Sequence, residues 1–118
     1  MITLYNPLKN YYFEVSPNDL PQKLNWFEVN SSLHNSNDKW RLPSIDELKI
    51  MHKYFEQNME IHLQHDNYWS GDLVFSYESD EILKLIGLAF ILDMALCISL
   101  SVVLTDKNLV RFVRSVSN

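Results

Sequence analysis

The sequence predicts a fold that combines two helices in its first half with strands at its start and in its second half. Two segments begin with a capping box, in which a Ser or Asn and a Glu three residues later satisfy each other's backbone N–H groups. Another segment, near the C-terminus, alternates apolar and polar residues as half-buried strands do. The chain also contains only 2 glycines, which are few for the tight turns of an all-β barrel.

The more strongly patterned helix is expected to begin at Ser44 and to run for about four turns. Ser44 and Glu47 have the spacing of a capping box. Apolar residues then recur at helical spacing, at Ile45, Leu48, Met51 and Phe55. Because proline disfavours a helical conformation in the residue before it, we expect a short extended segment to lead into this helix, formed by Trp40, Arg41, Leu42 and Pro43.

A shorter helix and an opening strand are expected before residue 35. Asn25 and Glu28 form the second capping box, and the polar residues 35–38 end the helix that it starts. Its apolar stripe is formed by Trp26, Val29 and Leu33. The first residues, including 11–13, are expected to form an opening strand that stops at the polar residues 16–19.

Residues 85–104 form an apolar stretch with a single charged residue, Asp93. Its length could span a bilayer, but a carboxylate near the middle of a span costs about 3 kcal/mol. The alternation over residues 98–102 also favours a strand. We therefore expect two strands of a mostly buried sheet rather than a membrane segment. A homo-oligomer is an open alternative, since this much apolar surface exceeds what one small domain readily covers.

The polar residues 105–108 predict a hairpin turn, followed by a last strand over residues 109–116. On such a strand Arg111 and Arg114 face opposite sides of the sheet, because their spacing is odd. They would then not line one ligand site together. At least one of them is expected to make a structural ion pair or to lie along an apolar surface.

Composition limits the class of protein. A chain of 118 residues is expected to form one domain, over residues 1–118. Its single cysteine, Cys97, excludes an intrachain disulfide and is expected to be an inert core thiol. Residues 1–20 lack the basic and apolar regions of a signal peptide, so a cytoplasmic protein is expected. The net charge of −5 argues against nucleic acid as a partner.

Four motifs taken in order resemble the DUF1566 family, also called the Lcl C-terminal domain. They are a helix start at Asn25-Trp26, the run WRLPSIDEL over residues 40–48, Tyr68-Trp69-Ser70 and the VRFVR of residues 110–114. The resemblance covers residues 18 to 116, and it implies an α+β, C-type-lectin-like fold related to the formylglycine-generating-enzyme type. Two helices would flank small antiparallel β-sheets. It also implies that Trp40, Leu42 and Trp69 are core or loop-anchoring residues.

The sequence departs from this family at several positions. Phe112 stands where the final strand usually carries a cysteine, and the segment after Trp69 lacks the usual Ser/Tyr/Asn/Gly-rich composition. The EPN-type and WND-type motifs with which sugar-binding C-type lectins hold calcium do not occur. The paired cysteines that an oxidase of the formylglycine-generating type requires are also missing, because Cys97 is the only cysteine.

Two groups of residues were weighed as metal ligands. Calcium needs six or more oxygen ligands, and we favour a solvated loop or a helix cap over a calcium site for the cluster Glu78, Asp80 and Glu81. His62 and His65 would share one face of a helix, but the alternation around them predicts an extended segment in which they point apart. We therefore expect no metal, no cofactor and no catalytic residue.

Three functions stay open. The first is a non-enzymatic recognition module that binds a protein or a glycan through the loop surface around residues 66–81. Its candidate contact residues are Tyr68, Trp69, Asp72, Tyr77, Glu78, Asp80 and Glu81. The alternative is a small acidic intracellular inhibitor or immunity-type protein that blocks a basic partner, because residues 55–82 carry acids and neither Lys nor Arg. An enzyme with an unrecognised site ranks last. Exposure of Trp69 would favour a glycan site, although we expect this side chain to be buried.

Overall fold

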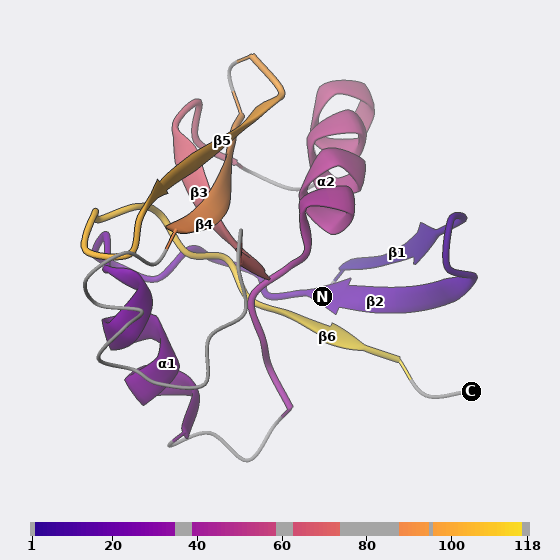
Figure 1. Cartoon of the computed structure of the whole chain (residues 1–118). Coiled ribbons are helices and arrows are strands. Elements are labelled where there is room, and N and C mark those ends of the chain that lie inside the picture. The colour runs from indigo at the N-terminus through magenta and orange to yellow at the C-terminus, as the bar shows by residue number, and fades with distance from the viewer. Residues whose placement is uncertain (1, 35–38, 59–62, 74–87, 95, 117–118) are drawn as a thin grey trace.

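Two helices and two three-stranded antiparallel sheets make up the part of the chain that the computed structural model describes, residues 2–34, 39–58, 63–73, 88–94 and 96–116 (Figure 1). This architecture confirms the predicted α+β class with two helices and small antiparallel sheets. Helix α2 packs against β1, β3 and β4, and so joins the two sheets.

The first sheet contains both ends of the described chain. It consists of β1 (Ile2–Asn6), β2 (Tyr11–Val15) and β6 (Val113–Ser115), with β2 in the centre. The expected opening strand is therefore two strands joined by a tight turn. Asn10 closes this turn with a φ of 56°, a left-handed conformation that asparagine tolerates better than most residues.

The second sheet consists of β3 (Asn67–Leu73), β4 (Leu88–Asp93) and β5 (Ile98–Val103), in that order. Two strands within the apolar stretch were predicted, and β4 and β5 confirm them. The expectation that both are mostly buried is wrong for β5, in which every side chain except Val102 is exposed. The reason is that β5 is the outer strand of a sheet on which α2 packs mainly over β3 and β4.

The predicted C-terminal hairpin is not formed. The chain does turn after β5, where the Asp106 N–H donates to the Val103 carbonyl at 3.1 Å. It then leaves the second sheet, and β6 pairs with β2 at the other end of the sequence. The last strand is also shorter than the expected 109–116, because residues 108–112 make their backbone hydrogen bonds with loop segments and with β3. A local apolar pattern indicates a strand but does not choose its partner.

Both predicted helices form, and both begin with the predicted capping boxes. In α1 (Trp26–His34), the side chain of Asn25 accepts the Glu28 N–H and that of Glu28 accepts the Asn25 N–H, each at 2.9 Å. In α2 (Ile45–Asn58), the Ser44 hydroxyl accepts the Glu47 N–H at 3.1 Å and the Glu47 carboxylate accepts the Ser44 N–H at 2.8 Å. Neither described helix is long and apolar enough to cross a membrane.

The buried side chains form two clusters. The first lies around Leu48 and Met51 of α2 and includes Phe13 of β2. The second lies around Trp69 and includes Val29 of α1. Residues 108–113, which we call the C-terminal segment, contribute to both clusters. Leu109 and Val113 belong to the first cluster and Val110 to the second.

Candidate functional site

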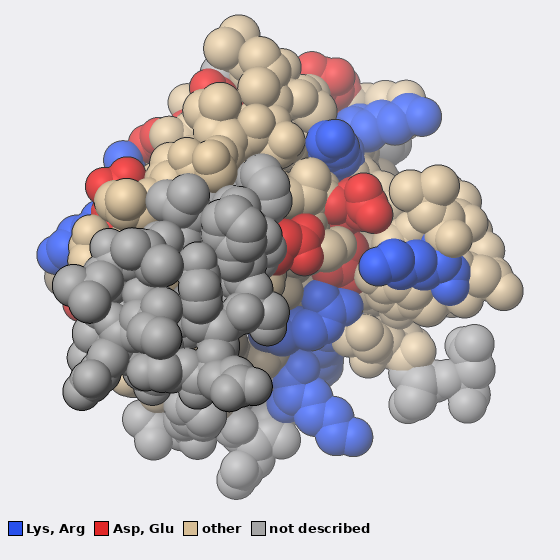
Figure 2. Space-filling view, in the orientation of Figure 1, with Lys and Arg blue, Asp and Glu red and all other residues tan. Residues whose placement is uncertain are grey.

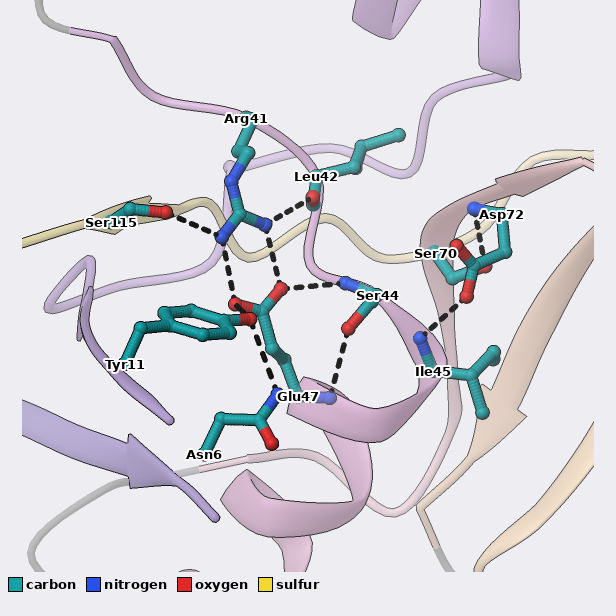
Figure 3. A network of polar contacts seen from close by, with 10 residues as sticks. All are labelled: Asn6, Tyr11, Arg41, Leu42, Ser44, Ile45, Glu47, Ser70, Asp72 and Ser115. Carbon is teal, nitrogen blue, oxygen red and sulfur yellow. Dashed lines mark hydrogen bonds and ion pairs between the residues drawn. The ribbon is translucent and has the colours of Figure 1, made fainter. Parts of the chain in front are cut away.

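An ion pair between the partly exposed Arg41 and the fully buried Glu47 is the centre of the first polar network (Figure 3). The guanidinium donates to both carboxylate oxygens, at 2.6 and 2.7 Å. Glu47 also accepts the Ser44 N–H at 2.8 Å and the Tyr11 hydroxyl at 2.5 Å. Arg41 donates in addition to the Ser115 hydroxyl at 3.0 Å. The network thus joins β2, the segment before α2, the first turn of α2 and β6.

These hydrogen-bond donors stabilise the ionised form of Glu47. Burial alone raises the pKa of a carboxyl group, but the hydrogen bonds from Arg41, Tyr11 and the Ser44 N–H outweigh burial and lower the pKa of Glu47. Burial and donation to Glu47 raise the pKa of Tyr11. A carboxylate has about four lone-pair positions, and four donors occupy them here. These four hydrogen bonds make Glu47 the point at which the segments of the network are held together.

A second polar network surrounds Asp19. The Arg111 Nε donates to Asp19 Oδ1 at 2.8 Å, and the Tyr68 hydroxyl donates to Asp19 Oδ2 at the same distance. Arg111 also donates to the Ser16 carbonyl at 3.1 Å, and the Tyr68 hydroxyl accepts the Gln64 N–H at 2.9 Å. Burial, together with the bond to Asp19, raises the pKa of Tyr68 well above its ordinary value. This network connects the loop after β2 to β3 and to the C-terminal segment.

The two C-terminal arginines both make structural contacts. Arg111 pairs with Asp19 as above, and Arg114 pairs with Glu14 at 3.0 Å and lies 4.4 Å from the centre of the Trp40 ring. These contacts confirm the expectation that at least one of them makes a structural ion pair. Arg111 precedes β6, however, so the argument from opposite faces of one strand does not apply to it.

The predicted contact surface around residues 66–81 is only partly described. Tyr68 and Trp69 are fully buried, and the Trp69 indole N–H donates to the Leu24 carbonyl at 2.6 Å. The burial of Trp69 is as expected, and it corrects the inclusion of both rings in a ligand surface, since a buried ring cannot stack on a glycan. Asp72 is exposed, but it accepts the Ile45 N–H at 2.9 Å and so caps α2 (Figure 3). The other candidates lie outside the described residues: Tyr77, Glu78, Asp80 and Glu81.

The acidic segment is also described only in part. Of its described acids, Asp66 pairs with Lys23 at 2.7 Å, and Glu56 lies 3.5 Å from His52. The hydrogen bonds from Lys23 and from the Asn67 N–H lower the pKa of Asp66. The ion pair with Lys23 offsets the charge of Asp66, one of the acids that were predicted to attract a basic partner. That alternative stays a prediction, because most of its acids lie outside the described residues.

Of the residues considered as metal ligands or as a core thiol, the structure describes only His65 and Cys97. Within the described ranges, there is no group of three His, Cys, Asp or Glu side chains placed to hold a metal ion. His65 lies edge-on to the Phe55 ring, with centroids 5.9 Å apart, while His62 is outside the described residues. Cys97 is half-buried at the edge of the first core cluster, in a left-handed conformation at the end of the β4–β5 turn.

The sequence left self-association of the apolar stretch open but did not locate its exposed part, which lies on β5 and the turn before it. We call it the β5 surface and define it by Leu96, Ile98, Leu100 and Val103, which are 68, 49, 46 and 48% exposed. In Figure 2 mainly uncharged side chains cover this region, at the top of the view. The signal in the sequence was the run of six residues 98–103, which contains no charged residue, no glycine and no proline.

The two outer strands of the second sheet differ in whether another segment pairs with their outer side. The outer edge of β3 is covered by the C-terminal segment, where the Trp69 N–H donates to the Leu109 carbonyl and the Leu109 N–H donates to the Asn67 carbonyl, each at 3.0 Å. At the other edge, β4 is the only strand of the described residues that pairs with β5. The backbone of β5 is therefore available for pairing on its outer side within this part of the structure.

No protein-family model matches the chain, and no curated protein is similar enough to count as a match. The resemblance to the DUF1566 family accordingly remains a prediction that rests on its four motifs.

Proposed function

We propose that this chain is a non-enzymatic recognition domain that binds another protein by pairing a strand of that partner with β5. The observation that carries the proposal is the β5 surface, an outer strand with half-exposed Ile98, Leu100 and Val103. The predicted contact region thus moves from residues 66–81, which include β3, to the outer strand at the opposite edge of the same sheet.

Edge strands expose unpaired N–H and C=O groups, and most proteins protect them with charged residues, proline or bulges. Strand β5 has none of these protections: its residues are Ile, Ser, Leu, Ser, Val and Val, and its register with β4 is regular over its whole length. An added strand would gain main-chain hydrogen bonds for affinity and alternate side-chain contacts for specificity. Leu96, at the tip of the β4–β5 turn, would add apolar contact area.

The polar residues support the non-enzymatic part of this proposal. Both networks of the described chain are occupied by contacts that hold segments together, as the four donors to Glu47 and the three partners of Asp19 show. A C-type-lectin-like assignment belongs to the proposal as well, since that scaffold keeps its helices and sheets while its binding surface varies. The expected cytoplasmic location stays a prediction.

Photo-crosslinking in cells that naturally contain the protein tests this function. A benzophenone amino acid is placed at Leu100 and, as the matched control, at Ser32, which is exposed on α1. We expect a discrete adduct with another protein from position 100 and none from position 32. The change Ile98→Lys, which places a charge on the same strand, should abolish the adduct.

Four outcomes would contradict the proposal. Equal adducts from both positions would mean unspecific contact, and the absence of an adduct at position 100 would mean that β5 has no partner strand. An adduct with a second copy of the chain would assign the β5 surface to self-association, which the apolar stretch had left open. Binding that instead disappears at high salt and survives Ile98→Lys would favour the acidic inhibitor.

A further inference from the structure

A groove between α2 and the β1–β2 hairpin is the second surface feature that the sequence did not indicate. It consists of two adjoining hollows, each with a volume of about 220 Å³. Leu8, Asp46 and Lys49 line the first hollow, Tyr5 lines the second, and both share Ile50 and Lys53. We call this the α2–β1 groove. It is separate from the β5 surface, with which it has no residue in common.

The groove exposes apolar side chains that a folded protein normally covers. Leu8, in the β1–β2 turn, is 76% exposed, and Tyr5 is 40% exposed. Each of the two adjoining hollows, at about 220 Å³, has room for a large side chain. Two neighbouring side-chain hollows along the outer strand of a sheet suit an extended peptide, in which alternate side chains on one face are about 7 Å apart.

The charges around the groove indicate the chemistry of that peptide. Lys49 and Lys53 are exposed and lie four residues apart, on the same face of α2. No ion pair is recorded for either of them within the described residues, although several other basic residues have an acidic partner there: Lys23, Arg41, Arg111 and Arg114. Figure 2 shows basic side chains over α2, with both uncharged and charged side chains around the neighbouring β1–β2 hairpin. An otherwise acidic protein thus has a locally basic rim on an apolar groove.

We infer that the α2–β1 groove binds a short acidic segment of a partner protein, with two apolar side chains in the hollows and Asp or Glu carboxylates beside Lys49 and Lys53. The net charge of −5 opposes an acidic ligand only weakly at this site, because charges beyond about 8 Å are screened at physiological ionic strength. Asp46 is the one lining carboxylate that opposes it directly. Replacing Asp46 with Asn should therefore strengthen peptide binding, whereas replacing the two lysines should weaken it.

Selection from a phage-displayed library of random short peptides tests the inference. The full chain is the target, and the double variant Lys49→Glu/Lys53→Glu removes peptides that bind elsewhere. We expect the enriched peptides to share two apolar residues flanked by Asp or Glu. For a labelled enriched peptide, fluorescence anisotropy should show roughly tenfold weaker binding to Lys49→Gln/Lys53→Gln and to Leu8→Ser, and severalfold tighter binding to Asp46→Asn.

Two control variants make the result specific. Lys107→Gln removes one positive charge from an exposed turn outside the groove, and Leu100→Lys alters the β5 surface; neither should change the affinity. Since Leu8, Lys49 and Lys53 are exposed, their variants should unfold at the wild-type temperature. Enrichment of peptides without acids, no enrichment at all, or equal affinity for the double variant would overturn the inference. A dimer that Leu8→Ser dissociates would also overturn it, because the occupant would then be a second copy.

Discussion

At the scale of single residues, Glu47 shows how a charged side chain can be fully buried in a small protein. Removing a carboxylate from water is unfavourable unless hydrogen bonds and an opposite charge replace the hydration. Here Arg41, Tyr11 and Ser44 supply four donors, from three different segments of the chain. These segments are held together through a single carboxylate. Loss of its charge should therefore weaken all four hydrogen bonds and the contacts between the segments that make them.

We predict that Glu47→Gln lowers the free energy of unfolding by about 2–4 kcal/mol, since it leaves the Arg41 charge partly buried without its partner. Urea denaturation at neutral pH measures this loss. Asp46→Asn is the matched control, because it makes the same chemical change one residue earlier at a half-buried position. A Glu47→Gln variant as stable as Asp46→Asn would show that the ion pair contributes little.

The same variant should change the dependence of stability on pH. The pKa of Glu47 is lowered in the folded protein, so its contribution is complete above the unfolded value of about 4.3 and is lost as the pH falls through the lower folded value. We therefore expect wild-type stability to fall more steeply than that of Glu47→Gln below about pH 4.3. Parallel curves for the two proteins in this range would contradict the assigned pKa direction.

At the scale of elements, the first turn of α2 has one local acceptor and one distant acceptor. The Ser44 hydroxyl accepts the Glu47 N–H from three residues away, while Asp72 of β3 accepts the Ile45 N–H from 27 residues away. Both satisfy N–H groups that have no partner inside the helix. Asp72 also connects α2 to the second sheet, and this contact explains the role of a residue that the sequence had suggested for ligand binding.

We predict that Asp72→Ala and Ser44→Ala each lower the free energy of unfolding by about 1 kcal/mol, the usual effect of losing a helix cap. Chemical denaturation of the two single variants and the double variant measures both effects and their coupling. Ser32→Ala, at an exposed position within α1, is the control and should have an effect within about 0.5 kcal/mol. If Asp72→Ala equals this control, Asp72 is not a cap of α2 and is available for the predicted contact surface.

Ser44 is a local acceptor and Asp72 a distant one, and this distinction also separates the features that the sequence could predict from those that it could not. Capping boxes, apolar stripes and the two strands of residues 85–104 depend on neighbours in the chain, and the structure confirms them. The pairing of β6 with β2 brings Arg114 beside Glu14, 100 residues away, and no local pattern encodes that distance. The exposure of β5 likewise depends on where α2 packs. A run of apolar residues looks the same whether its surface is covered or left for a partner.

At the scale of the whole molecule, residues 108–113 connect parts of the chain that are far apart in sequence. The backbone carbonyls of Val110 and Phe112 accept the N–H groups of Leu20 and Ser16, each at 2.9 Å. Val113 exchanges two backbone hydrogen bonds with Arg41, at 2.8 and 2.9 Å. The side chains of this segment enter both core clusters. One stretch of six residues therefore contributes to both clusters, and the two should unfold together.

Val110→Ala tests whether the molecule is one cooperative unit. Val110 is fully buried in the second cluster, and truncation of such a side chain removes about 2 kcal/mol of stability. If the clusters unfold together, hydrogen exchange should show equal losses of protection for the slowest amides of α1, beside the second cluster, and of β2, in the first. The control Val103→Ala alters a half-exposed side chain of β5 and should change neither set by more than about 0.5 kcal/mol. A loss confined to α1 would mean that the clusters open independently, and the C-terminal segment would then be a contact between two units rather than part of one.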